Sequence, residues 1–103
     1  MLYIYRVEND LGEGCYWFKD TGKVLSNHFT EEGYPLHPTP LEDIGIERTP
    51  EIEEVCGFLN LKQAKNWFTD EELKELKELG FHLKKVKVKK ITAKGNKQVL
   101  AIR

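Results

Sequence analysis

The chain has 103 residues, a net charge of −1 and 40% hydrophobic residues, which suffices for one packed domain over residues 1–103. This composition excludes an intrinsically disordered chain, and two cysteines without a CxxC or Cys/His cluster exclude a disulfide scaffold and a zinc site. No apolar run approaches the roughly 20 residues that cross a bilayer, so we expect a cytoplasmic protein without membrane contact.

The predicted elements begin with residues 2–7, LYIYRV, whose apolar residues on both faces indicate a strand inside a sheet. Residues 8–14, ENDLGEG, predict a turn. The following CYWF, residues 15–18, is compatible with a second short strand. Residues 33–50 contain all four prolines and predict a long surface loop, of a kind that often carries function.

A strand and a helix are predicted next. VCGFL, residues 55–59, reads as a short apolar strand, and Asn60 is suited to cap the helix that follows. The helical spacing of four apolar residues predicts one buried stripe. These residues are Leu61, Ala64, Trp67 and Phe68.

A second helix is predicted between Thr69 and Gly80. Thr69 and Glu72 have the spacing of a capping box, and Gly80 is placed to end the helix. The 3.6-residue period predicts that its leucines are buried. They are Leu73, Leu76 and Leu79.

From Phe81 the hydrophobic period changes to two, which predicts strands. Phe81 and Leu83 alternate in the opposite phase to Val86 and Val88, so we expect a β-bulge at residues 84–85. KGNK, residues 94–97, predicts a tight turn, and QVLAIR then pairs back. The predicted fold is α+β: a small mixed or antiparallel sheet with one or two covering helices and a C-terminal β-hairpin. Its central strands are expected to be the first and the last.

The charge is divided along the chain. All 17 acidic residues precede Gly80, whereas residues 81–103 carry eight of the 16 basic residues. This split is compatible with an anionic partner, with internal neutralisation, or with a strand whose lysines prevent edge pairing. A nucleic-acid binder that uses the basic C-terminal hairpin is therefore an alternative function. The pI near 6.3 and the absence of an aromatic RNA-binding signature beside these lysines disfavour it.

Arg6 is the first candidate site residue, because a guanidinium in a central strand keeps its charge and must be paired. One interpretation is a structural ion pair with Glu8, Glu53 or Glu54. The other is an anion-binding arginine that faces a phosphate or a carboxylate. The glycine loop and the aromatic residues that follow Arg6 favour the second interpretation.

The loop after the first strand and the proline-rich loop supply further candidates. Gly14 permits close backbone approach to a ligand, and Tyr16 and Trp17 can stack beside it, although a lone Gly-x-Gly also suits an ordinary turn. His37 lies between two prolines, either as a solvated loop residue or on the rim of a ligand or partner site.

Cys15 and Cys56 are predicted to be core residues, because their apolar surroundings raise a thiol pKa. No spacing of Ser, Cys, His and Asp marks a hydrolase triad, and no cluster marks a metal site. Whether the protein is an enzyme is left open by these patterns.

The order of short motifs resembles a family of small phage-encoded proteins of unsettled function. The motifs are YRVEND, GEG, HPTPLEDIG, CGF, WF, ELKELGF and QVL, and they cover nearly the whole chain. The resemblance implies an accessory protein that antagonises a host process, such as a defence system, in the host cytoplasm. Its partner would be a nucleotide-like ligand or a host protein.

A looser resemblance is to ADP-ribosyltransferase-like folds, which have an NAD-binding Arg or His in the first strand. It implies NAD or a related nucleotide as cofactor, bound by Arg6, and places Gln98 where such folds have a catalytic glutamate. Gln98 supplies no negative charge, so the resemblance implies binding with lost or weak transfer. Glu8, Glu42 and Asp43 are the acidic residues that could substitute for the missing glutamate.

Overall fold

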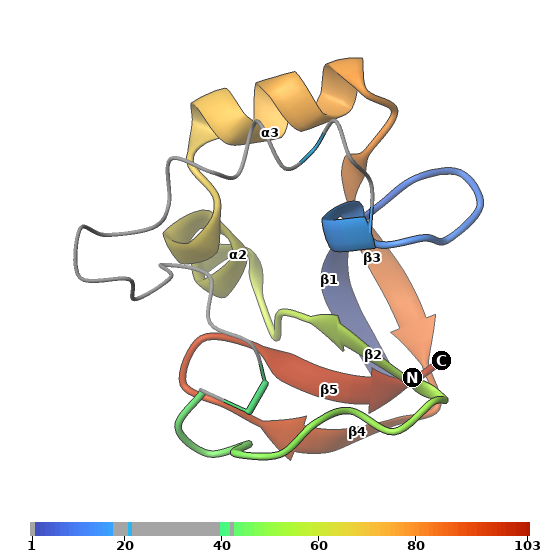
Figure 1. Cartoon of the computed structure of the whole chain (residues 1–103), viewed down its shortest axis with the longest axis vertical. Helices are drawn as coiled ribbons and strands as arrows, with labels where there is room; N and C mark the ends of the chain where they lie inside the picture. Colours follow the sequence, from blue (N-terminus) through green and yellow to red (C-terminus); the bar gives the residue numbers. More distant parts are fainter. Residues whose placement is uncertain (1, 18–20, 22–39, 42) are drawn as a thin grey trace.

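The computed structural model describes residues 2–17, 21, 40–41 and 43–103, and confirms a small α+β fold with a C-terminal hairpin (Figure 1). Its strands are β1 (Leu2–Glu8), β2 (Glu54–Gly57), β3 (His82–Val88), β4 (Lys90–Lys94) and β5 (Val99–Ile102). The helices whose bounds lie in the described residues are the 3-10 turn η1 (Cys15–Trp17), α2 (Leu61–Trp67) and α3 (Asp70–Glu78). None of the helices in this part of the chain is long and apolar enough to cross a membrane.

Both α-helices begin at the predicted caps. The Asn60 side chain accepts a hydrogen bond from the backbone of Gln63, and Thr69 and Glu72 form a reciprocal capping box. After α3, Gly80 adopts a φ of 92°, in the left-handed region that favours glycine. The caps therefore explain where each helix starts and where α3 ends.

The five described strands pair antiparallel and form two sheets, which a bridge between β1 and the end of β2 joins. β1 pairs with β3, and β5 lies between β2 and β4. Tyr5 of β1 exchanges two backbone hydrogen bonds with Phe58, immediately after β2. β5 is central, as predicted, and β1 has β3 on one side and the Phe58 bridge on the other.

Glycine at position 57 permits this close approach of β1 to β2. A Cβ atom there would lie 2.6 Å from Cδ1 of Ile4 and 2.7 Å from the backbone oxygen of Tyr5. Neither atom can retreat easily, because Ile4 is completely buried and the Tyr5 oxygen accepts the Phe58 hydrogen bond. Gly57 thus brings the end of β2 against β1.

The β1–β3 pair contributes to two separate hydrophobic clusters, one on each face. Val7 and Leu83 pack with the aromatic residues of α2 and with Leu76 of α3, whereas Ile4 and Val86 pack against β5. The predicted bulge at residues 84–85 is wrong, because β1 and β3 pair without interruption from Leu2–Val88 to Glu8–His82. The change of hydrophobic phase reflects burial of opposite faces at the two ends of the strand.

Four further details differ from the sequence prediction. CYW is a 3-10 turn rather than a strand, and the strand predicted from Phe81 is divided at Lys89 into β3 and β4. Leu61 and Leu79 are 49% and 41% exposed, because each lies at a helix end beyond the packed stripe. The register irregularity occurs in β4, between Ile91 and Ala93.

The C-terminal hairpin is held by a carboxylate from the proline-rich loop. Asp43 is 2% exposed, and its side chain accepts hydrogen bonds from the backbone N–H groups of Lys97 and Gln98 at 3.0–3.2 Å. A Cβ on Gly95 would collide with this carboxylate. Asp43 therefore fills an anion-binding turn of the chain itself.

Candidate functional site

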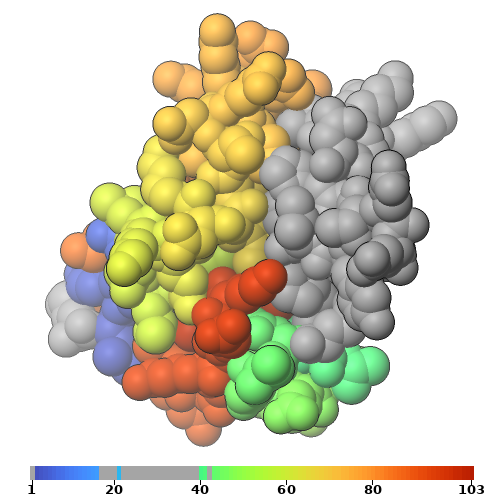
Figure 2. Space-filling model, turned by 90° about the vertical axis from the view of Figure 1, so that its left-hand side faces the viewer, coloured from blue at the N-terminus to red at the C-terminus, as the bar shows by residue number. Residues whose placement is uncertain are grey.

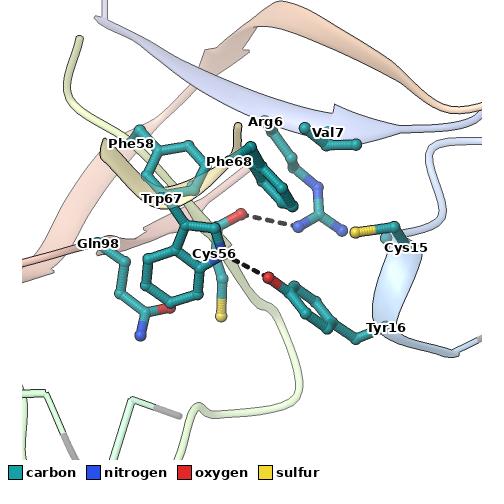
Figure 3. Close-up of a pocket in the computed structure, with 11 residues that line it drawn as sticks. Arg6, Val7, Cys15, Tyr16, Cys56, Phe58, Trp67, Phe68 and Gln98 are labelled. Atoms are coloured by element: carbon teal, nitrogen blue, oxygen red, sulfur yellow. Dashed lines mark hydrogen bonds between the residues drawn. The ribbon is translucent and has the colours of Figure 1, made fainter. Parts of the chain in front are cut away.

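A small cavity lies where β1, η1, the end of β2, the end of α2 and the start of β5 meet (Figure 3). Its volume is about 50 Å³, which is space for a few water molecules at most. Four of the residues predicted for a ligand site line it: Arg6, Gly14, Tyr16 and Gln98. His37 and the side chain of Trp17 lie outside the described residues.

Arg6 reaches the cavity from β1, where its guanidinium makes two directed contacts. Its Nη1 donates to the backbone oxygen of Cys56 at 2.7 Å, and its Nε donates to Oε2 of Glu8 at 3.1 Å. Figure 3 shows the guanidinium among Cys15, Cys56 and Tyr16. The ion pair with Glu8 is the first of the two interpretations considered for Arg6, and it coexists with a place in the cavity wall.

Glu8 is shared by two arginines. Its side chain is 4% exposed, and Arg103 binds it with Nη1–Oε2 and Nη2–Oε1 distances of 2.8 and 2.7 Å. This two-pronged contact is the strong arginine–carboxylate geometry. Sequence reasoning missed Arg103, although its place at the end of a predicted central strand was a usable signal.

Gly14 lies against the guanidinium of Arg6. A Cβ at this position would lie 3.0 Å from Nη2 of Arg6, so a larger residue would press on the guanidinium. An isolated bridge between Glu8 and Gly14 closes the loop at this point. Glycine therefore leaves room here for the close approach of the Arg6 side chain.

The aromatic wall of the cavity comes mainly from α2 and the residue after β2. Phe58 lies with its ring centroid 5.4 Å from that of Trp67 and 6.0 Å from that of Phe68. Tyr16 as a whole residue is 54% exposed, but its hydroxyl accepts a hydrogen bond from Nε1 of Trp67 (Figure 3). Burial of that hydroxyl raises the Tyr16 pKa, which makes the group a poor general base at neutral pH.

The two cysteines that line the cavity are free thiols. Burial raises the pKa of Cys15 to about 12, and burial also raises the pKa of Cys56. The charge of Arg6 opposes both shifts without cancelling them. Because the thiolate is the nucleophile, neither cysteine is prepared for covalent chemistry.

The acidic residues considered as substitutes for a catalytic glutamate are committed elsewhere. Glu8 is held by its two arginines, and Asp43 binds the backbone at Lys97 and Gln98. Glu42 lies outside the described residues. Gln98 itself is 3% exposed and lines the cavity as a neutral side chain.

A second, larger hollow of about 270 Å³ lies between α2 and the β4–β5 turn. Figure 2 shows the face of the molecule on which these two segments meet. Its described lining is Gln63, Asn66, Trp67, Asn96 and Lys97. The Gln63 amide already accepts a hydrogen bond from the backbone of Leu59, so part of this polar lining serves the fold.

The structure shows no group of three or more metal-binding side chains among the residues that it describes. The searches of curated proteins and of solved structures found no match. None of the comparisons shows a similarity to an ADP-ribosyltransferase. A family model described as "Bacteriophage T4 Y00F protein" matches residues 1–103. Because this match spans the whole chain, the protein belongs to the bacteriophage T4 Y00F protein family.

Proposed function

We propose that this phage accessory protein antagonises a host process by docking on a host protein through the loop between β1 and η1. One observation carries the proposal: Leu11 is 84% exposed at a loop, residues 9–13, whose backbone is fixed by its own hydrogen bonds. Figure 1 shows this loop projecting from the body beside β3. An exposed apolar side chain on an ordered loop suits an anchor in a partner's pocket.

The order of the loop comes from Asn9. Its side-chain oxygen accepts hydrogen bonds from the N–H groups of Leu11 and Glu13 at 3.0 and 2.9 Å, and its amide donates to the Glu13 carboxylate at 3.1 Å. Gly12 has a φ of 79°, and its N–H donates to the backbone oxygen of Asn9. Such a loop loses little conformational entropy on binding, which favours affinity.

The loop is also anchored to the rest of the protein. Lys84 donates to the backbone oxygen of Asn9 at 3.3 Å, and the loop starts at Glu8, which binds both Arg6 and Arg103. The nearly buried Glu8 carboxylate and its two arginines thereby support the base of the loop. Asp10 and Glu13 are exposed on either side of Leu11, so the fitting partner has an apolar pocket with basic groups at its rim.

Binding of a nucleotide-like ligand is the second candidate, because Arg6, Tyr16 and Gln98 line one cavity. Against it, the cavity of about 50 Å³ is well below the ~300 Å³ usual for small-molecule sites. Arg6 would also have to leave Glu8 and Cys56. Calorimetry with NAD and ADP-ribose tests this candidate, for which we expect no heat. An NAD-dependent transferase is weaker still, because Glu8 and Asp43 are already bound.

Host-protein docking is tested with immobilised wild-type protein, Leu11→Ala and Ile52→Ala in lysate of the host bacterium. Ile52 is fully exposed outside the loop, so its variant removes a matched aliphatic group. A protein captured by the wild type is then purified and titrated against all three. We expect Leu11→Ala to weaken that affinity by about tenfold or more and Ile52→Ala to leave it unchanged. Equal affinity of the Leu11 variant would overturn the proposal.

A further inference from the structure

The outer face of the β1–β3 pair alternates aromatic and cationic side chains. In the antiparallel register Tyr3 lies opposite Lys87, and Tyr5 lies opposite Lys85. Because side chains alternate along a strand, these four odd-numbered residues share one face. We call them the β1–β3 face. The tyrosines come from one end of the chain and the lysines from the other.

This face extends beyond the part that the helices cover. Val7, Leu83 and Phe81 share its parity and pack in the cluster beneath the helices, whereas Lys85 and Lys87 are exposed and Tyr3 is 39% exposed. Tyr5 is half-buried at the boundary. The same pair of strands therefore has a packed end and an accessible end.

At the accessible end, the two described strands contribute lysines and no carboxylate to this face. No odd-numbered residue of β1 or β3 is acidic, and neither Lys85 nor Lys87 forms an ion pair within the described residues. The ammonium of Lys85 lies 4.8 Å from the centroid of the Tyr3 ring. By contrast, Lys84 and Arg103 contact Asp10 and Glu8, so part of the basic segment is neutralised internally.

We propose that the β1–β3 face binds single-stranded nucleic acid. Lysines spaced along a strand can follow a phosphate backbone, and a tyrosine between them can stack on an unpaired base. A duplex keeps its bases stacked and leaves the ring without a partner. An acidic protein would satisfy the lysines but would not use the ring. The proposal goes beyond host-protein docking, which relies on the separate loop of residues 9–13.

In the folded protein, aromatic residues do lie beside the lysines of the basic segment. No aromatic signature stands beside Lys85 and Lys87 in the sequence, since their aromatic neighbours are about eighty positions earlier. Pairing of β1 with β3 supplies Tyr3 and Tyr5 at the required places. The low overall pI reflects acidic residues that do not belong to this face, five of which lie on α3.

Fluorescence anisotropy with a labelled single strand of about 12 nucleotides tests the proposal, with the matching duplex and poly-glutamate as alternative ligands. DNA and RNA versions of the strand are both used. We expect a dissociation constant of about 10 μM or tighter at low salt. The single strand should bind better than the duplex, and affinity should fall linearly with the logarithm of salt concentration.

Variants separate stacking from general charge. Tyr3→Ala should weaken single-strand binding about fivefold or more, whereas Tyr3→Phe should retain it. Neutralising Lys85 and Lys87 together should reduce the salt slope by about 1.4. The matched control neutralises Lys74 and Lys77, which are exposed on α3, and should change neither quantity. Thermal melts establish that every variant is folded, as expected for exposed positions.

Three results would overturn the proposal. Absence of binding at low salt would mean that Lys85 and Lys87 only prevent an edge strand from pairing with another chain. Equal affinity for poly-glutamate would indicate an acidic protein partner. An equal loss of affinity in the Lys85/Lys87 variant and in the Lys74/Lys77 control would indicate binding by overall charge rather than at this face. Leu11→Ala should bind the oligonucleotide normally, so failure of host-protein docking and failure of this proposal are distinguishable.

Discussion

Arg103 binds the carboxylate of Glu8, which lies 95 positions earlier in the sequence, with two nitrogen–oxygen distances below 2.9 Å. Arg6 binds the same carboxylate from two residues away. One nearly buried anion therefore ties β1 to the end of β5 and to the wall of the cavity. The two arginines and Glu8 together carry one net positive charge. The backbone oxygen of Cys56 accepts a hydrogen bond from Arg6.

This arrangement predicts that Arg6 is needed for stability. Arg6→Ala removes one of two cations from Glu8 and leaves the Cys56 oxygen without its guanidinium, so we expect a loss of about 3 kcal/mol in the free energy of unfolding. Urea denaturation at neutral pH measures it. Arg6→Lys should recover only part of the loss, because an ammonium cannot make both directed contacts.

The control for Arg6 is Lys65→Ala, which breaks an ion pair with Asp70 whose two side chains are 52% and 88% exposed. Exposed pairs contribute little, so its effect should stay within about 0.5 kcal/mol. An unchanged urea midpoint in Arg6→Ala would show that the cluster is not structural. It would restore the interpretation of Arg6 as a group held ready for a ligand.

The fold was predictable where local signals decide it. The Asn60 cap, the Thr69–Glu72 box and Gly80 each act over a few residues, and each occurs where the sequence indicated. The bulge prediction failed because alternation along β3 was assigned to a single buried face. Two clusters bury opposite faces of the strand, and this depends on neighbours that the local sequence does not specify.

The candidate site was predictable only in part for the same reason. Arg6, Gly14, Tyr16 and Gln98 do line one cavity, but the contacts that define their roles are long-range. Glu8 pairs with Arg103, and Asp43 accepts hydrogen bonds from the C-terminal hairpin. Both contacts join segments more than fifty positions apart. Amino-acid composition and the period of the hydrophobic residues do not predict such long-range contacts.

Leu76 and Leu79 should differ sharply in their contribution to stability. Leu76 of α3 is fully buried against the aromatic residues of the core, so Leu76→Ala should lower the free energy of unfolding by about 2–5 kcal/mol. Leu79 caps the helix and is 41% exposed, so Leu79→Ala should cost less than about 1 kcal/mol. Both are measured by urea denaturation. Equal midpoints for the two variants would contradict the packing of α3.

Stability in acid should depend on Glu54. Arg48 donates two hydrogen bonds to this carboxylate at 2.7 and 2.8 Å, and Thr92 donates a third. These contacts, led by Arg48, lower the Glu54 pKa from 4.5 to about 2. The folded state therefore binds this proton less readily than the unfolded state does. The resulting stabilisation is complete above pH 4.5 and is lost as the pH falls through 2.

Urea unfolding of wild type and Glu54→Gln across this acid range measures the contribution. At neutral pH the variant should be less stable, because a neutral amide cannot reproduce the two charge-assisted bonds from Arg48. The difference between the two proteins should shrink as the pH falls, since protonation removes the same charge from the wild type. Glu53→Gln, at the exposed neighbouring position, should follow the wild-type profile. Parallel profiles for wild type and Glu54→Gln would mean that Arg48 does not hold this carboxylate in solution.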